Sequence, residues 1–320
     1  MREAATRGWR RATKADAEAV EVFLRSRESR AAGLIARLLG EGRLRIPSLF
    51  GATGLWIRSE GEGPVEAATL GLVGGLWFVQ LPAGAKSAAG LALALEEASR
   101  KPGFAPPKPT SVIGPASSVA AFEAALKLAS YHAVDYRLME RAAWGIGAPA
   151  PDCEPRCPIS LWKATPADLG ELLPLQEAYE KEEVVTPLRG FDAESCRAFL
   201  ARNLAIELIV AARLSGTALA DGGPDRGAGS GEFFGRAVGK AATNARAFTL
   251  DQIGGVFVEV EYRGRGIAAA LMAFLLGITA KEGRGSSLFV KKGNAPALSL
   301  YERLGFDLVD DFRASYQLPR

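Results

Sequence analysis

The order of apolar and polar residues in the second half of the chain predicts a strand, a helix and a second strand. Residues 253–260 read Ile-Gly-Gly-Val-Phe-Val-Glu-Val, a β-type run. Residues 266–282 are apolar on most faces and stop at Gly283, as a buried helix does. Residues 287–290, Ser-Leu-Phe-Val, read as a short buried strand. This order predicts a parallel crossover unit of the usual right hand.

The connection from the first strand to the helix is rich in glycine and arginine. Residues 263–268 read Arg-Gly-Arg-Gly-Ile-Ala. Glycine lets the backbone turn tightly and approach a phosphate, and a helix N-terminus offers free N–H groups and partial positive charge. The loop therefore predicts a site for a phosphate-bearing cofactor. A loop of this kind is, by itself, equally typical of an ordinary strand-to-helix turn.

A second motif follows the second strand, in residues 291–306. Asn294 is a good helix cap, and Pro296 suits a first helical turn. Tyr301 follows Asn294 by seven residues, close to two helical turns, so both side chains can face the mouth of the glycine-rich loop.

Taken together, these motifs resemble the GNAT superfamily of acyl-CoA-dependent N-acetyltransferases. Residues 263–268 are similar to the family's Gln/Arg-x-x-Gly-x-Gly/Ala signature. Asn294, Tyr301 and Leu304-Gly305-Phe306 are similar to its C-terminal motif. The resemblance covers roughly residues 159–320. It implies an α/β fold with a mixed sheet, in which acetyl-CoA, the co-substrate, lies in a splay between the strands at 253–260 and 287–291.

The resemblance also implies roles for single residues. Main-chain groups of Val256, Phe257 and Val258 would pair with the pantetheine arm, and amides of residues 264–269 would hold the pyrophosphate. Asn294 would either hold pantetheine or only cap its helix. The implied cofactor-binding set is Val256, Phe257, Val258, Arg263, Gly264, Arg265, Gly266, Ile267, Ala268, Ala269, Asn294 and Tyr301.

Acetyl transfer from a thioester to an amine requires a deprotonated amine, a stabilised oxyanion and a proton for the leaving thiolate. A phenol has a pKa near 10 and a thiol one of roughly 8.5, so Tyr301 could act as the general acid. Alternatively, Tyr301 is a core aromatic that only contacts the cofactor. The backbone N–H of Val258 is the expected oxyanion donor, since preorganised amides commonly fill that role.

The general base stays open at this point. Some family members carry a glutamate five residues before the motif asparagine, where this chain has Phe289. Asp251 and Glu259 lie on the first strand, and a water relay is a further alternative. A helical segment, residues 177–183, adds Glu180, Glu182 and Glu183, although such a charge run is also typical of a solvated helix face.

An internal repeat predicts two related domains. Residues 11–16 resemble 163–168, an offset of 152, and each reads as a strand followed by a helix start capped by Thr or Asp. Residues 74–79 resemble 254–259, and residues 136–138 resemble 316–318, both at an offset of 180. We expect a degenerate GNAT-like domain at 1–142, a linker rich in Pro, Gly and Ala at 143–158, and a catalytic GNAT domain at 159–320. Residues 221–231 are expected to form an exposed, mobile insertion.

The offset of 180 assigns each motif residue a counterpart in the first copy. These counterparts lack the cap, the phenol and most of the loop, so the first half is expected to keep the fold without the chemistry. Its helices are expected near 14–28, 30–41 and 87–100, and its strands near 53–58, 65–71, 74–81 and 111–113. The counterparts of Arg263, Gly264, Gly266, Ala268, Asn294 and Tyr301 are Ala83, Gly84, Lys86, Ala88, Gly114 and Ala121.

Composition narrows the function class. The chain has 320 residues, so two domains are expected, and its net charge of +3 is too small to indicate nucleic acid. No apolar run reaches about 18 residues and no secretory signal is visible, so we expect a cytoplasmic protein without a membrane span. Three cysteines, Cys153, Cys157 and Cys196, with only His132 as a further soft ligand, do not form a metal-binding pattern. Cys153 and Cys157 are read as reduced thiols of the linker.

The predicted function is N-acetyl transfer from acetyl-CoA to an amine by direct attack in a ternary complex. The alternatives are a non-catalytic acyl-CoA sensor, or an acyltransferase that acts on a thiol or hydroxyl or uses a longer acyl-CoA. The acceptor and the oligomeric state cannot be read from the sequence. We expect the acceptor to bind at the cleft between the halves, near the acidic segment 177–183. In the alternative, the first half serves only solubility or dimerisation.

Overall fold

The structure, a computed structural model, describes residues 8–47, 53–82, 88–100, 106–129, 131–143, 154–184, 190–215 and 234–318. The predicted insertion at 221–231 and Cys153 lie outside these residues. The N-terminal half contains β1 (Trp9–Arg11), α2 (Ala17–Arg25), α3 (Glu28–Leu38), β4 (Gly54–Arg58), β5 (Ala67–Gly71), β6 (Leu76–Gln80), α4 (Leu91–Ser99), β7 (Ser111–Pro115), α5 (Ala116–Ala125) and β8 (Tyr131–Arg141), with a small β2–β3 hairpin (Leu39–Gly40, Arg43–Leu44).

The C-terminal half repeats this order of elements. It contains β9 (Ile159–Lys163), α6 (Leu169–Tyr179), a π-helical turn η4 (Glu180–Val184), α7 (Ala193–Ile206), β10 (Ile209–Ser215), β11 (Phe234–Arg246), β12 (Leu250–Val258), α8 (Ile267–Lys281), β13 (Gly285–Lys291), α9 (Ala295–Arg303) and β14 (Asp307–Gln317).

The two helix starts at the head of the repeat have the predicted caps. Asp16 accepts hydrogen bonds from the main-chain nitrogen of Thr13 (2.7 Å) and from its hydroxyl (2.9 Å). Asp168 does the same for Thr165, at 2.7 and 3.0 Å. In both copies this capping box satisfies N–H groups that a helix start leaves without partners.

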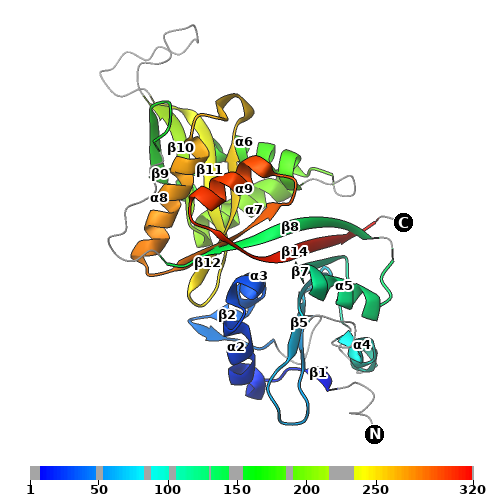
Figure 1. Ribbon diagram of the computed structural model, residues 1–320. Helices are drawn as coiled ribbons and strands as arrows, with labels where there is room; N and C mark the ends of the chain where they lie inside the picture. Colours follow the sequence, from blue (N-terminus) through cyan, green and yellow to red (C-terminus); the bar gives the residue numbers. More distant parts are fainter. Residues whose placement is uncertain are drawn as a thin grey trace.

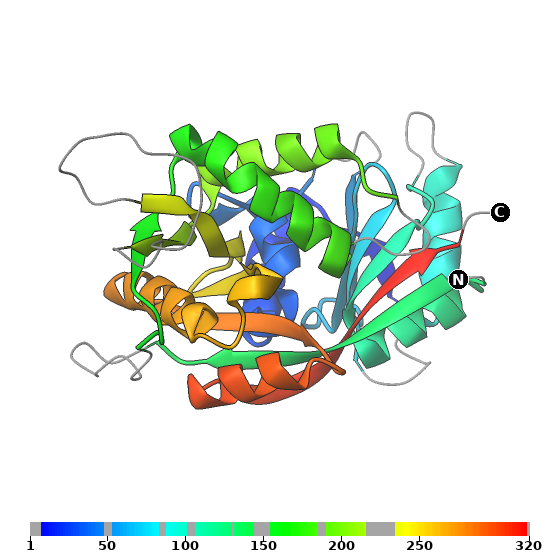
Figure 2. The ribbon, with the colours of Figure 1, turned by 90° about the horizontal axis from the view of Figure 1, so that it is seen from above.

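One sheet of 12 strands runs through both halves, in the order β1-β4-β5-β6-β7-β14-β8-β13-β12-β11-β10-β9. The halves lie one above the other, and β8 and β14 cross between them (Figure 1). In the C-terminal half, α6 and α7 cover one face of the sheet, and α8 and α9 cover the other (Figure 2). The mixed α/β fold with tandem halves therefore agrees with the prediction.

The halves exchange their last strands. β8, from the N-terminal half, pairs with β13, from Ser286 opposite Arg141 to Lys291 opposite Tyr136. β14, from the C-terminal half, pairs with β7. β8 and β14 also pair with each other. Each half therefore completes the sheet of the other, a feature that the repeat in the sequence did not predict.

The exchange corrects the offset between the copies. Tyr136 lies directly opposite Phe312, 176 positions later, at the middle of the β8–β14 ladder. Gly90 and Gly266, also 176 apart, both cap a helix with positive φ, at 90° and 81°. The counterpart of Gly266 is therefore Gly90 rather than Lys86. The counterparts of Asn294 and Tyr301 become Ser118 and Ala125, while Ala83, Gly84 and Lys86 lie outside the described residues.

The splay predicted in the C-terminal half is present. β12 and β13 run parallel and pair only from Leu250 opposite Gly285 to Ile253 opposite Leu288. Beyond this point β12 pairs only with β11, and β13 pairs only with β8. The two strands therefore separate into a V that opens at Gly254.

The corresponding place in the N-terminal half is closed. By the offset of 176, β6 and β7 stay paired for one position more than β12 and β13 do, to Phe78 opposite Ile113. Gly114 then packs so tightly that a Cβ there would lie 2.4 Å from the carbonyl oxygen of Val79. The Ser118 hydroxyl accepts from the Leu81 nitrogen (3.0 Å) and donates to the Leu81 oxygen (2.8 Å). Side chain and backbone therefore occupy the space that the C-terminal half leaves open.

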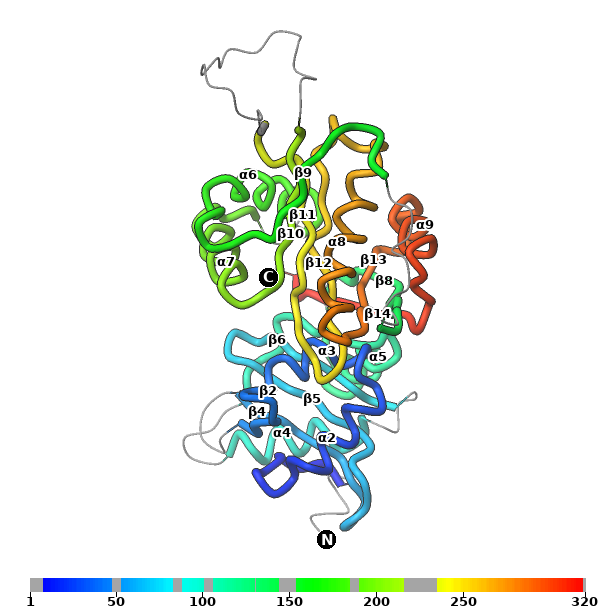
Figure 3. Tube along the Cα trace, turned by 90° about the vertical axis from the view of Figure 1, so that its left-hand side faces the viewer, coloured from blue at the N-terminus to red at the C-terminus, as the bar shows by residue number. Residues whose placement is uncertain are grey.

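Helix α3 of the N-terminal half reaches the C-terminal half. It packs against β11 and β12, and the turn between these strands extends down to it (Figure 3). The Glu28 carboxylate accepts from the Thr249 hydroxyl (2.8 Å) and the Leu250 nitrogen (3.1 Å). None of the described helices is both long enough and apolar enough to span a membrane.

The strand exchange predicts that the C-terminal half cannot fold alone. Residues 155–320 lack β7 and β8, so β14 loses both neighbours and β13 exposes an edge, which favours aggregation. We expect this fragment to aggregate in size-exclusion chromatography and to lack a cooperative thermal transition in circular dichroism. Co-expressed residues 1–143 should restore a soluble complex of the two halves. A monodisperse fragment that unfolds cooperatively by itself would contradict this.

Candidate active site

A cavity of about 1200 Å³ fills the splay and continues into the N-terminal half. On the C-terminal side its walls are β12, the loop before α8, the exposed end of β13 and α9. On the other side it is lined by a group that we term the N-terminal wing: Arg30, Gly33, Leu34, Arg37, Leu76 and Phe78. Both halves therefore contribute to one cavity.

The predicted phosphate loop faces this cavity. Gly264 and Gly266 have φ of +76° and +81°, which glycine adopts without strain. Gly266 is the N-cap of α8, so the first-turn amides at Ile267, Ala268 and Ala269 stand at the cavity wall. Arg263, Gly264 and Gly266 therefore line the cavity together with this first turn.

The linker between the halves lies directly on this loop. The Arg156 nitrogen donates to the Arg265 oxygen (2.8 Å), and a Cβ on Gly266 would lie 3.2 Å from Cα of Pro155. Arg265 itself does not line the cavity: its guanidinium donates to the Glu261 oxygen (3.2 Å) and stacks over Tyr262. Among the predicted loop residues, Arg265 thus acts through its backbone, as an anchor for the linker.

Strand β12 presents alternate main-chain groups to the splay. The Glu259 nitrogen donates to the Val238 oxygen on β11 (3.0 Å), so alternation directs the N–H and C=O of Val258 to the opposite edge. The same alternation turns the main chain of Phe257 toward β11. The Val258 oxygen accepts from Nε of Arg263 (2.9 Å). The Arg263 side chain therefore lies along β12 at the cavity wall, and its role in cofactor binding stays a prediction.

Tyr301 reaches the cavity from α9. It is 7% exposed and packs edge-on against Phe306, with ring centres 6.0 Å apart. Among the described residues no hydrogen bond involves its hydroxyl, which leaves that group available to a bound molecule. Burial raises the pKa of Tyr301, and the nearby Tyr179 and Glu183 raise it further. Tyr301 is thus a protonated donor throughout the neutral range.

Asn294 acts as a helix cap. Its Oδ1 accepts from the Ala297 nitrogen (3.1 Å), which starts α9 at Ala295. The residue also lines the cavity, so its amide nitrogen is still available for a second contact. Both roles considered from the sequence are compatible with this position.

The turn η4 joins the two arms of the splay. Glu182 pairs with Arg263 beside β12 (2.8 Å), and Glu183 pairs with Lys291 at the end of β13 (2.7 Å). Both glutamates line the cavity. Glu183 also contributes to the raised pKa values of three tyrosines, which places it among their hydroxyls: Tyr136, Tyr179 and Tyr301. These tyrosines, apart from Tyr301, were not singled out in the sequence.

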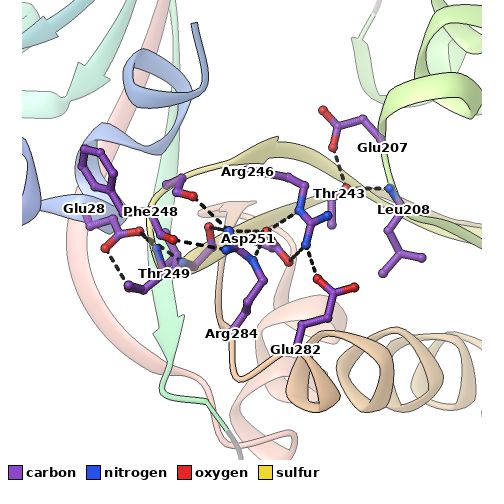
Figure 4. A network of polar contacts seen from close by, with 12 residues as sticks. Glu28, Glu207, Leu208, Thr243, Arg246, Phe248, Thr249, Asp251, Glu282 and Arg284 are labelled. Atoms are coloured by element: carbon purple, nitrogen blue, oxygen red, sulfur yellow. Dashed lines mark hydrogen bonds and ion pairs between the residues drawn. The ribbon is translucent and has the colours of Figure 1, made fainter. Parts of the chain in front are cut away.

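The remaining base candidates do not line the cavity. Glu180 accepts from Gln176 (3.0 Å) on the other side of the turn. Glu259 pairs with Arg236 at the surface. Asp251 is fully buried between Arg246 (3.0 Å) and Arg284 (2.8 Å), in the network of Figure 4. Phe289, which stands where some GNAT proteins carry a glutamate, stacks on Phe312 with ring centres 3.9 Å apart.

A buried lysine supports the bend of β12. Lys240 on β11 is 2% exposed, and its ammonium donates to the Gly255 oxygen (3.2 Å) and lies 4.7 Å from the centre of the Tyr179 ring. Burial lowers the pKa of Lys240 to about 8. Gly255 has φ of +60° in a β-bulge, where the register between β11 and β12 shifts. No pattern in the sequence distinguishes this lysine from an exposed one.

The Asp251 network predicts a structural role for that carboxylate. Asp251→Asn leaves two guanidinium groups without their buried partner, so we expect the free energy of unfolding to fall by about 3 kcal/mol in urea titrations. The pH profile of any activity should be unchanged, because the side chain does not reach the cavity. The matched variant Glu282→Gln, which removes only the exposed partner of Arg246, should cost less than about 1 kcal/mol. A loss of turnover in a fully folded Asp251→Asn variant would contradict this assignment.

Comparisons with known proteins agree with this architecture. Residues 223–306 match the acetyltransferase (GNAT) family. A search of curated proteins finds no match. Three similar solved structures are a Drosophila protein, a GCN5-related N-acetyltransferase from Sphaerobacter thermophilus and a tandem GNAT protein from the clavulanic acid biosynthesis pathway. Their identities are 11, 18 and 16%, and their TM-scores are 0.60, 0.53 and 0.50.

These similarities extend over nearly the whole chain. The three alignments cover 98, 96 and 98% of this chain, and 99, 94 and 98% of the Drosophila, Sphaerobacter and clavulanic-acid-pathway chains. At such identities the structures establish a common fold, while the sequence match lies in the half that carries the phosphate loop and Tyr301. The chain therefore has the fold of the tandem GNAT proteins, and residues 223–306 in its C-terminal half match the GNAT acetyltransferase family.

Proposed function

We propose that the protein transfers an acetyl group from acetyl-CoA to an amine by direct attack in a ternary complex. The observation that carries this proposal is the single cavity, which joins the phosphate loop, Tyr301 and Glu183 to the N-terminal wing. The cofactor can enter along the loop and β12 while the acceptor enters from the wing. Both substrates can thus be held at once, as direct attack requires.

Cations near the loop suit the phosphates of coenzyme A. Arg156 lies on the linker and Arg303 ends α9, and both line the cavity. Among the described residues neither guanidinium has a carboxylate within 4 Å. Together with the first-turn amides of α8 they would provide a positive surface for a pyrophosphate and a further phosphate group.

The side chains at the centre of the cavity can perform the proton transfers. Glu183 accepts a proton from the acceptor ammonium, and the neutral amine then attacks the thioester carbonyl. The N–H of Val258, directed into the splay, stabilises the oxyanion. As the C–S bond breaks, Tyr301 donates its proton to the thiolate and recovers one from the nitrogen of the new amide. Neutral amide and thiol are the products.

The N-terminal half is proposed to bind no acyl-CoA. Ser118 and Gly114 close its splay at the place that the pantetheine arm would need. The described residues there include no tyrosine at the counterpart of Tyr301, which is Ala125. Its role is therefore to complete the sheet and to form one wall of the cavity.

The function is tested by screening amines with acetyl-CoA while free CoA thiol is measured. Release of thiol with an amine, together with an acetylated product in mass spectrometry, supports N-acetyl transfer. A thiol or alcohol as the better acceptor, or a longer acyl-CoA as the better donor, would change the reaction class. Tight acetyl-CoA binding without turnover of any acceptor would favour a sensor.

Acetyl-CoA should bind at one site per chain, in the C-terminal half. Gly266→Asp introduces a carboxylate beside the phosphate position, and also a Cβ at φ +81° against Pro155, so calorimetry should detect no binding. The matched variant Gly90→Asp, at the counterpart glycine, should bind as the wild type does. A stoichiometry of two, or binding that depends on Gly90, would contradict the single site.

Tyr301→Phe should lower kcat by about 10²- to 10⁴-fold and leave the affinity for acetyl-CoA unchanged, because only a proton donor is removed. The raised pKa keeps Tyr301 protonated, so no fall in wild-type kcat from this group is expected below about pH 10. Tyr131→Phe, which removes a hydroxyl bonded to Pro109 outside the cavity, is the control. Equal turnover by Tyr301→Phe and wild type would reduce Tyr301 to a packing residue.

Glu183→Gln should lower kcat at neutral pH by at least about 10²-fold if Glu183 is the base. Part of the activity should return as the pH rises toward the pKa of the acceptor amine, because free amine then forms without help. Glu177→Gln, on the preceding helix α6 and outside the cavity, should behave as wild type. Loss of activity that no increase in pH restores would argue against a role as base.

A further inference from the structure

The cations that line the cavity fall into two groups. Three are paired with carboxylates at 2.6–2.8 Å: Arg30 with Asp310, Arg263 with Glu182, and Lys291 with Glu183. Three others, Arg37, Arg156 and Arg303, have no carboxylate within 4 Å among the described residues. Under the proposed function Arg156 and Arg303 serve the cofactor phosphates. Arg37 lies in the N-terminal wing and is left without a role.

Arg37 is held in a fixed position by its own half. Its Nη1 donates to the Gly33 oxygen one turn earlier (2.9 Å), and its guanidinium carbon lies 4.6 Å from the centre of the Phe78 ring. Both partners line the cavity. Stacking on an aromatic ring leaves the edge of the guanidinium, with its N–H donors, directed away from the ring. The group is thus ordered without being neutralised.

Among the described residues no carboxylate forms an ion pair with Arg37. Burial by the cavity walls lowers the pKa of Arg37, and the nearby Arg202 lowers it further. Glu207 acts in the opposite direction, but its carboxylate accepts from the Thr243 hydroxyl (2.6 Å) (Figure 4). The Arg37 side chain is exposed and lines the cavity. An anion in the wing would therefore meet an ordered cation whose N–H donors are open to the cavity.

The helix that carries Arg37 is fixed to the catalytic half. Glu28, at the start of α3, holds the turn between β11 and β12 through Thr249 and Leu250. Asn244 and Gln252, near that turn, line the cavity as neutral amides. The position of Arg37 relative to β12 is therefore set by hydrogen bonds between the halves and does not depend on a mobile hinge.

We propose that the acceptor amine carries a second, anionic group, a carboxylate or a phosphate, and that Arg37 binds this group. The inference rests on the proposed function. The acidic residues of η4 do not offset the wing's positive charge, because Glu182 and Glu183 already pair with Arg263 and Lys291. The N-terminal half thereby selects the acceptor, and the C-terminal half carries out the transfer. Arg37 is a specificity residue that takes no part in proton transfer.

The test compares three matched panels of amines with acetyl-CoA. One panel carries a carboxylate, as in amino acids, dipeptides and ω-amino acids. The second carries a phosphonate in its place, and the third carries a neutral carboxamide. Each panel is assayed by thiol release with the wild type, Arg37→Gln, Arg37→Lys and the control Arg100→Gln, a surface arginine paired with Glu96 outside the cavity. Circular dichroism and acetyl-CoA affinity confirm that each variant is folded and binds the cofactor.

The wild type should prefer an anionic panel over the carboxamides by about 10- to 100-fold in kcat/KM, the usual effect of a hydrogen bond to a charged group. Arg37→Gln should remove this preference through KM, with acetyl-CoA affinity and carboxamide turnover unchanged. Arg37→Lys should keep part of it, and Arg100→Gln all of it. The better anionic panel identifies the group as carboxylate or phosphate.

Two results would overturn the inference in distinguishable ways. If wild type uses carboxamides as well as acids, or if Arg37→Gln lowers both equally, the proposed function stands and the anionic acceptor is wrong. If no panel is turned over while acetyl-CoA binds, the N-acetyltransferase function fails, and the inference fails with it.

Discussion

The exchange of β8 and β14 is the constraint on which the rest of the structure depends. In each half the strand after the crossover helix finds its outer neighbour in the other half, β8 beside β13 and β14 beside β7. Because β8 pairs with β13 as far as Lys291, β13 can separate from β12 beyond Leu288 and still be held in the sheet along its other edge. The same exchange brings α3 against β11 and β12. The strand exchange is therefore the common physical cause of the splay and of the second cavity wall.

The splay also requires β12 to bend, and a buried cation supports that bend. The bulge at Gly255 turns the strand, and the Lys240 ammonium binds the carbonyl that the bulge exposes. Because the pKa of Lys240 falls to about 8 from its ordinary value near 10.4, its charge costs stability at neutral pH. This loss of stability decreases only as the pH rises from about 8, the pKa of Lys240 in the folded protein, toward the ordinary pKa of lysine. Stability is thus reduced beside the splay, as is common where a site needs a fixed shape.

Local features of the sequence predicted local structure well. The glycine-rich turn before α8, the cap at Asn294 and the position of Tyr301 at the cavity depend on spacings within one crossover, and the structure has these features. The strand exchange joins residues 145 to 205 positions apart, which periodicity cannot reveal. The offset of 180 was inferred from two Gly-Gly pairs that have different structural roles. Gly254-Gly255 belongs to a bulge, whereas Gly74-Gly75 forms a turn before β6. The proposal of Glu183 as the general base, among several glutamates, depends on which of them line the cavity, and the sequence does not show this.

The closed splay of the N-terminal half shows how two copies of one fold come to differ at the same place. Gly114 lets β7 approach β6, and the Ser118 hydroxyl satisfies both main-chain groups of Leu81 that an open strand would present to a ligand. With these polar groups satisfied internally, the strand pair of the N-terminal half needs no ligand to complete its hydrogen bonding. Its α3 side instead forms one wall of the cavity that opens in the C-terminal half.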